Sequence, residues 1–148
     1  MTWNVLIVED CDKDMTLIVR AFRTSDKLRV IHTVDSGDEA ARYLDGQGLY
    51  ADRTTYPFPH LLITDLKMPG FDGLDLLEWL KEHPQPQLTV MMLTGSTLQH
   101  HEDATEKLGA DAFFNKPNTQ EKMMNLIETI EHLMAVSPKA ALQTKSAN

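Results

Sequence analysis

Acidic residues stand directly after two apolar runs of the sequence. Glu9 and Asp10 follow the run WNVLIV (3–8). Asp65 follows the run LLIT (61–64) and precedes KMPGFDG. Short apolar runs bounded by turn residues are typical of parallel strands that are buried on both faces. Open α/β sheets bind ligands beyond the carboxyl ends of their strands, so these acids stand where a binding site is expected.

Three carboxylates at one sheet edge need compensating positive charge. Two such charges about 4 Å apart repel by roughly 4 kcal/mol at an effective dielectric near 20. Lys116, in the sequence NKP, can supply one positive charge, and a divalent cation can supply two more. Mg²⁺ fits oxygen ligands better than zinc does, because the histidines and the cysteine are not grouped. We expect Asp10 and Asp65 to be direct ligands, and Glu9 to act through water or by orientation.

Thr94 and Lys116 also follow apolar runs and are expected at the same edge. A hydroxyl, an ammonium and Mg²⁺ around one aspartate form a pocket for a phosphoryl group with three charged oxygens. Carboxylates form acyl phosphates when a metal neutralises the developing charge. The pattern therefore predicts that Asp65 is a nucleophile toward phosphorus.

The elements that position these residues alternate between strands and helices along the chain. The expected strands are 3–8, 28–34, 61–64, 88–93 and 110–115. The expected helices follow a cap at Asp12, span 36–46, run from Gly73 to Pro84, occupy roughly 98–108, and carry the apolar stripe from Met123 to Met134. Alternation of this kind predicts an α/β fold, with a doubly wound five-stranded parallel sheet of order 2-1-3-4-5 in a flavodoxin-like three-layer (βα)5 arrangement.

Length and charge limit the classes of protein. A chain of 148 residues predicts one domain, which we place at 1–136, followed by a flexible C-terminal tail at 137–148. The net charge of −8 disfavours direct binding to nucleic acid. No apolar run reaches the roughly 20 residues that cross a bilayer, and the N-terminus lacks the features of a secretory signal. We therefore expect a cytoplasmic protein that does not bind membranes.

The strand-end residues form an ordered set of motifs, namely Glu9-Asp10, Asp65 followed by KMPGFDG, Thr94-Gly95 and Lys116-Pro117. This set resembles the receiver domain of two-component response regulators over roughly residues 3 to 135. The resemblance implies Mg²⁺-dependent phosphorylation of Asp65 by a sensor histidine kinase, with the main-chain carbonyl of Lys67 as a further metal ligand. It implies that Lys116 contacts the phosphoryl group and that the Lys116–Pro117 bond can be cis. Such a domain catalyses only its own phosphorylation and dephosphorylation.

The resemblance also assigns residues to switching and to the lifetime of the phosphoryl group. Thr94 and Phe113 correspond to switch positions, and the fourth helix, fifth strand and fifth helix form the surface that would engage a separate target protein. Lys67 and Ser96 correspond to positions that tune dephosphorylation. We hypothesise that the Lys67 cation alters access or orientation of the hydrolytic water. The implied phosphodonor is a sensor histidine kinase or a histidine phosphotransfer protein, and a homodimer through the same surface is left open.

The segment GQGLYADRTTYPFPH (46–60) is longer than most connections in such folds. We favour a surface insertion, and the alternative is a partner-binding flap, because Tyr50, Tyr56 and Phe58 are costly to expose. With this insertion the sequence resembles a subgroup of single-domain receivers that are paired with phytochrome-type or hybrid sensor kinases.

Two other classes use the same residues. A Mg²⁺-dependent aspartyl-phosphate phosphatase also has a strand-end aspartate, but it carries a second acid two positions later, where this sequence has Lys67. A pseudo-receiver keeps the fold without the chemistry, and the complete set of acids argues against it.

Overall fold

A five-stranded parallel sheet forms the centre of the protein. The computed structural model describes residues 2–95 and 109–136. The strands are β1 (Trp3–Val8), β2 (Leu28–Val34), β3 (Leu61–Thr64), β4 (Thr89–Thr94) and β5 (Ala112–Asn115). They pair in the order β2-β1-β3-β4-β5, and every pair is parallel. The predicted doubly wound sheet and its strand order are confirmed.

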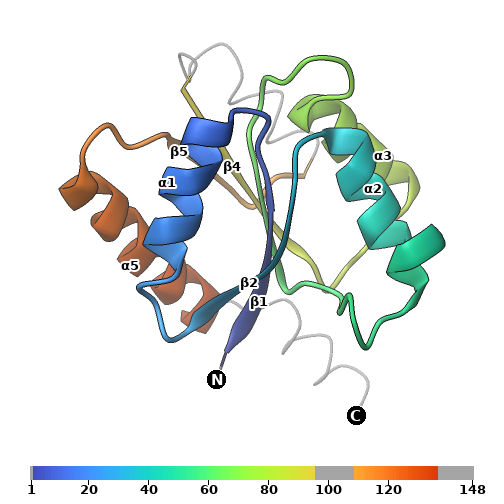
Figure 1. Ribbon diagram of the computed structural model, residues 1–148, viewed down its shortest axis with the longest axis horizontal. Helices are drawn as coiled ribbons and strands as arrows, with labels where there is room; N and C mark the ends of the chain where they lie inside the picture. Colours follow the sequence, from blue (N-terminus) through green and yellow to red (C-terminus); the bar gives the residue numbers. More distant parts are fainter. Residues whose placement is uncertain (1, 96–108, 137–148) are drawn as a thin grey trace.

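Helices cover both faces of this sheet. The helices are α1 (Asp12–Phe22), α2 (Gly37–Asp45), α3 (Gly73–Glu82) and α5 (Gln120–Val136), with a short 3-10 helix η1 (Gly48–Ala51). Figure 1 shows α1 and α5 on one side of the sheet and α2 and α3 on the other. The predicted fourth helix at 98–108 and the tail at 137–148 lie outside the described residues. Within the described part of the chain, no helix combines the length and the apolarity needed to cross a bilayer.

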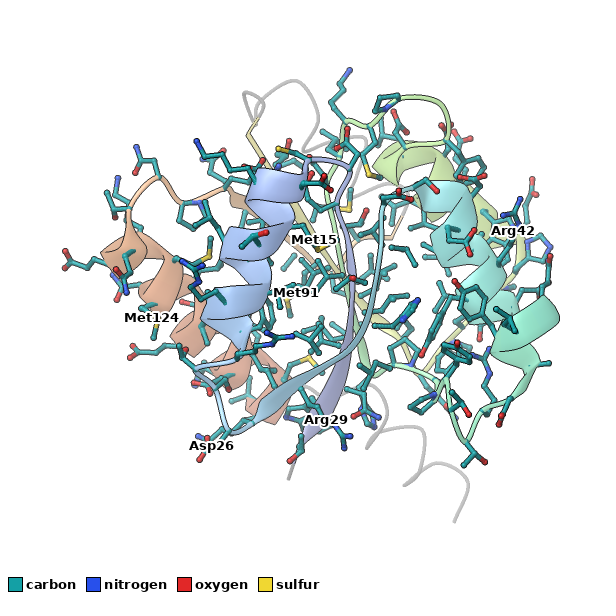
Figure 2. The ribbon with its side chains drawn as sticks, in the orientation of Figure 1. Met15, Asp26, Arg29, Arg42, Met91 and Met124 are labelled. Carbon is teal, nitrogen blue, oxygen red and sulfur yellow. The ribbon has the colours of Figure 1, made fainter. Side chains whose placement is uncertain are left out.

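The two faces of the sheet bury separate apolar cores, because side chains alternate along each strand. In β1, Val5 and Ile7 pack with residues of α1 and α5, whereas Leu6 and Val8 pack with residues of α2 and α3. Figure 2 shows Met15 and Met91 in the space between α1 and the sheet. Burial on both faces explains why the strands read as continuous apolar runs.

The start of α1 differs from the prediction by one residue. The N-cap is Cys11, which makes no side-chain cap hydrogen bond, and Asp12 is the first helical residue. The Cys11 amide donates to Glu9 Oε2 at 3.2 Å, so the Glu9 side chain has already fixed the extended backbone before the helix begins. Asp12 instead places its charge in the first turn, where the helix dipole favours an anion.

Aromatic rings from the insertion pack against the body of the protein. His32 of β2 stacks on Tyr43 of α2, with ring centroids 5.2 Å apart. Tyr50 and Tyr56 pack against both of these rings. The Tyr43 hydroxyl donates to the carbonyl oxygen of Pro57 at 2.8 Å, which ties α2 to the far end of the insertion.

Arg53 fastens the insertion from within. Its guanidinium donates to the carbonyl oxygens of Leu44 (3.0 Å) and Tyr56 (3.2 Å) and lies 5.5 Å from the centre of the Phe58 ring. Contacts within this chain therefore cover Tyr50, Tyr56 and Phe58, and no partner protein is needed to cover them. This favours the surface insertion over the partner-binding flap. Leu49 is the one large aliphatic side chain of the insertion, and it stays 76% exposed.

Candidate functional site

The carboxyl ends of β1 and β3 bring three carboxylates together. Glu9 and Asp10 follow β1, and Asp65 follows β3, where its amide donates to the carbonyl oxygen of Val8 at 3.1 Å. One carboxylate oxygen from each of Glu9, Asp10 and Asp65 lies within 4.8 Å of the others. Glu9 and Asp65 are 3% and 8% exposed, and Asp10 is exposed. The predicted convergence of these residues is therefore present.

Lys116 reaches into this cluster from the residue after β5. Its amide donates to the carbonyl oxygen of Thr94 at 2.7 Å, so the pairing of β4 with β5 fixes its backbone. Its Nζ lies 2.5 Å from Glu9 Oε1, 2.9 Å from Asp65 Oδ2 and 2.8 Å from Asp14 Oδ2. One ammonium thus faces three carboxylates, and Asp10 adds a fourth negative charge beside them.

Burial and the neighbouring charges together shift the pKa values of Glu9 and Lys116. Burial raises the pKa of Glu9 to about 7, and the Asp65 charge adds to the increase. The Lys116 ammonium and the Cys11 amide act in the opposite direction and only partly offset it. Burial by itself lowers the pKa of Lys116, but its hydrogen bonds to Asp14, Glu9 and Asp65 outweigh burial and raise that pKa.

The two carboxylate oxygens of Asp65 have different partners. Oδ1 accepts a hydrogen bond from the Leu66 amide at 2.7 Å, and Oδ2 accepts one from the Lys116 ammonium at 2.9 Å. The backbone therefore holds the carboxylate in one orientation. Its only contact with a charged donor among the described residues is the one with Lys116.

The loop after Asp65 is anchored at both ends. The Gly73 amide donates to the carbonyl oxygen of Leu66 at 3.0 Å, and the Gly37 amide of α2 donates to that of Phe71 at 3.1 Å. A Cβ on Gly73 would overlap the carbonyl oxygen of Asp65, so this position needs glycine for close approach. The loop that carries Lys67 is thereby closed beneath the strand ends, with the Lys67 side chain exposed.

The donor set fits a hard divalent cation. Carboxylate oxygens are the ligands that Mg²⁺ and Mn²⁺ prefer, and three of them converge here without histidine or thiolate. Glu9 Oε1 is buried, and its one positively charged contact among the described residues is the Lys116 ammonium. The same ammonium also contacts Asp14 and Asp65, so the three converging carboxylates keep unbalanced negative charge that a divalent cation can neutralise.

Two other predicted residues, Thr94 and Phe113, lie on β4 and β5. Thr94 is buried at the end of β4. Phe113 is half-buried on β5 and packs against the core on the α2 and α3 face. Ser96 lies outside the described residues. The Lys116–Pro117 bond, for which the resemblance implied a cis form, is trans, because the described residues contain no cis peptide bond.

Asp14 is the member of the cluster that the sequence did not reveal. It lies in the first turn of α1 and contacts Lys116 at 2.8 Å. An acid one turn after the Glu9-Asp10 pair was the available signal. The reach of the Lys116 side chain across the sheet edge decides the contact, however, and no spacing in the sequence encodes it.

Comparison with known proteins agrees with this geometry. Response regulator Rcp1 of Synechocystis sp. is 28% identical over 131 residues, which cover 86% of this chain and 85% of the relative. The crystal structure of the phosphorylated cyanobacterial phytochrome response regulator RcpA matches with a TM-score of 0.80 at 25% identity, over 93% of this chain and 96% of the other. The Mn²⁺-bound form of Rcp1 matches with a TM-score of 0.77 at 26% identity, over 91% and 96% of the two chains.

The family model of the response regulator receiver domain matches residues 5–128. This range contains the sheet except for Trp3 and Asn4 at the start of β1. It also contains the strand-end cluster, which consists of Glu9, Asp10, Asp14, Asp65 and Lys116. The chain therefore belongs to the response regulator receiver domain family.

Proposed function

We propose that this protein is a single-domain response regulator that accepts a phosphoryl group on Asp65. Receiver domains are the phosphoacceptors of two-component signalling, and the donor is a histidine kinase or a histidine phosphotransfer protein. The observation that carries the assignment to Asp65 is its carboxylate, which is held by the Leu66 amide and Lys116 at the centre of the acidic cluster. Glu9 also contacts an amide, that of Cys11, and the Lys116 ammonium, but burial raises its pKa to about 7, so it is less available than an ordinary carboxylate as an anionic nucleophile. Asp10 is exposed and makes no ion pair with Lys116 among the described residues.

In the proposed reaction a carboxylate oxygen of Asp65 attacks the phosphorus of a phosphohistidine. A P–O bond forms as the P–N bond breaks, and the electron pair of the broken bond stays on the ring nitrogen. The imidazole leaves neutral, with a proton on its other nitrogen. Lys116, 2.9 Å from Asp65 Oδ2, is placed to hold an oxygen of the transferred group, and Thr94 is placed at the neighbouring strand end.

Mg²⁺ is the proposed cofactor. Glu9, Asp10, Asp65 and the main-chain carbonyl of Lys67 would hold it, and it would neutralise charge on the phosphoryl oxygens. The three converging carboxylates, two of which contact the same ammonium, support this assignment. The Mn²⁺-bound Rcp1 structure shows that a similar protein takes a divalent cation.

The proposed binding surface for a target protein consists of the fourth helix, expected at 98–108, together with β5 and α5. Thr94 and Phe113 are the proposed switch residues, because Thr94 ends β4 beside Lys116 and Phe113 lies half-buried on β5. A downstream protein would bind this surface after phosphorylation, and a homodimer through it is an alternative use. Lys67 and Ser96 are proposed to set the phosphoryl lifetime, and the exposed Lys67 side chain is free to approach an attacking water.

We place the receiver domain at 1–136 in a cytoplasmic protein, and the proposed tail at 137–148 lies outside the described residues. The first candidate for the donor is a phytochrome-type sensor kinase, because RcpA is a phytochrome response regulator and is similar over most of its chain. Transphosphorylation from such a kinase, followed by a pull-down with and without a phosphoryl mimic, would identify both partners.

Intact-mass analysis tests the central step. Purified protein given acetyl phosphate and Mg²⁺ should gain one phosphoryl group, and peptide mapping should locate it on Asp65. Asp65→Asn should gain none. Asp26→Asn, an exposed aspartate beyond the C-terminal end of α1, away from the strand-end cluster, is the matched control and should be modified like the wild type.

Two outcomes would replace the proposal. Absence of the added group, or its attachment to another residue, would favour the pseudo-receiver. Turnover of phosphate monoesters would favour the aspartyl-phosphate phosphatase, which the exposed lysine at position 67 disfavours.

A further inference from the structure

Asp14 contacts Lys116 from α1, whereas Glu9, Asp10 and Asp65 follow strands β1 and β3. It lies in the first turn of α1, and its Oδ2 is 2.8 Å from the Lys116 ammonium. Its side chain is 37% exposed, whereas those of Asp65 and Glu9 are 9% and 1% exposed. Lys116 therefore has two deeply buried anionic partners and one partner at the rim.

The two buried partners are also the proposed ligands of the divalent cation. A cation and the Lys116 ammonium compete for the same oxygens, because both are positive and Glu9 Oε1 and Asp65 Oδ2 each contact the ammonium. Asp14 is outside the group of three converging carboxylates, so it remains available to Lys116 when those oxygens turn to a metal.

We propose that Asp14 is the alternative counter-ion of Lys116, a positioning residue that draws the ammonium away from Glu9 and Asp65. This inference rests on the proposed function. Asp14 favours entry of the cation, because it takes the competing ammonium to the rim. It opposes the phosphorylated state, because the same ammonium must leave Asp14 to hold a phosphoryl oxygen.

Removing the Asp14 charge should therefore change Mg²⁺ affinity and phosphorylation rate in opposite directions. Asp14→Asn should weaken Mg²⁺ binding about fivefold, the size expected when one half-exposed ion pair is lost. At saturating Mg²⁺ the same variant should be phosphorylated by acetyl phosphate about fivefold faster, because Lys116 is no longer retained at the rim. A damaged site would instead lose both properties.

Asp12→Asn is the matched control. Asp12 is an exposed aspartate in the same first turn and makes no salt bridge among the residues that the structure describes. Asp12→Asn removes one negative charge close to the site but leaves the contact between Asp14 and Lys116 intact. We expect it to change either quantity by less than about twofold, because exposed charges are screened. Asp14→Glu keeps the negative charge, so its Mg²⁺ affinity and its phosphorylation rate should both stay close to those of the wild type.

The experiment measures Mg²⁺ dissociation constants by calorimetry without phosphodonor, and phosphorylation rates by intact mass at saturating Mg²⁺. A double-mutant cycle with Lys116→Met shows whether Asp14 acts through the ammonium. In the Lys116→Met background, Asp14→Asn should change Mg²⁺ affinity no more than Asp12→Asn does.

Three results would overturn the inference: equal effects of Asp14→Asn and Asp12→Asn, effects of the same sign on binding and phosphorylation, or an undiminished effect on Mg²⁺ affinity in the Lys116→Met background. The proposed function fails separately, if wild-type protein is not phosphorylated on Asp65. Because the calorimetric arm uses no phosphodonor, it tests Asp14 in either case.

Discussion

Glu9→Gln should change how the stability of the metal-free protein depends on pH. The folded pKa of Glu9 is raised from 4.5 to about 7, mainly by burial. Between these values the folded state holds the proton more tightly than the unfolded state does. The resulting stabilisation is complete below pH 4.5 and is lost as the pH rises through about 7.

The size of the effect follows from the two pKa values. Linkage with a folded pKa of about 7 and an unfolded pKa of 4.5 gives a loss of about 2 kcal/mol between roughly pH 5.5 and pH 8. Glutamine is uncharged at every pH and keeps the shape of the side chain. The free energy of unfolding of Glu9→Gln, relative to wild type, should therefore increase by about 2 kcal/mol over this range.

Urea denaturation in EDTA, followed by circular dichroism at several pH values, measures the difference. Burial lowers the pKa of His32 and of His60, so their contributions to stability increase as the pH rises through their ordinary value. These contributions are common to both proteins and cancel in the comparison. Glu78→Gln, at an exposed glutamate of α3, is the matched control and should give a constant difference. A constant difference for Glu9→Gln as well would refute the assignment of a buried, strained carboxylate.

Three further predictions concern the metal, a glycine and the insertion. Saturating Mg²⁺ should raise the urea midpoint of the wild type at pH 8 more than that of Glu9→Gln, because a cation stabilises the charged carboxylate; equal shifts would contradict a role for Glu9 in the metal site. Gly73→Ala should lower the free energy of unfolding by about 3 kcal/mol, because its Cβ would overlap the Asp65 carbonyl oxygen; a neutral result in urea denaturation would mean that α3 shifts at no cost. Arg53→Ala should lower the free energy of unfolding, measured by urea denaturation, by about 2 kcal/mol, because two hydrogen bonds to carbonyl oxygens and a ring contact are lost. Arg42→Ala is the control and should lower it by less than about 1 kcal/mol, because the ion pairs of Arg42 are exposed. Similar losses in the two variants would show that Arg53 does not hold the insertion in place.

The strands and the carboxylate cluster were predictable because one constraint governs both. A parallel strand buried on both faces must be a short apolar run, and its carboxyl end must lie at the ligand-binding edge. The runs before Glu9 and Asp65 therefore located the acids before any contact was known. β4 and β5 were placed to within a residue or two for the same reason.

Contacts between distant side chains could not be predicted in this way. The Asp14–Lys116 pair joins residues 102 positions apart, and it depends on the length and direction of a flexible side chain. The packing of Tyr50 and Tyr56 on His32 and Tyr43 depends equally on how the insertion folds back. The start of α1 was misplaced because the Glu9 side chain, and not a cap at Asp12, fixes the preceding turn.

The closed loop between Leu66 and Gly73 has a consequence for substitutions at Lys67. Its ends are tied to each other, and Phe71 is tied to α2 through Gly37. The backbone around Lys67 is therefore held in place by hydrogen bonds, whereas the Lys67 side chain is exposed to solvent. We therefore expect substitutions of Lys67 to change the rate at which the phosphoryl group is lost from Asp65 without changing the backbone of the loop. The rate of dephosphorylation could then vary independently of the stability of the fold.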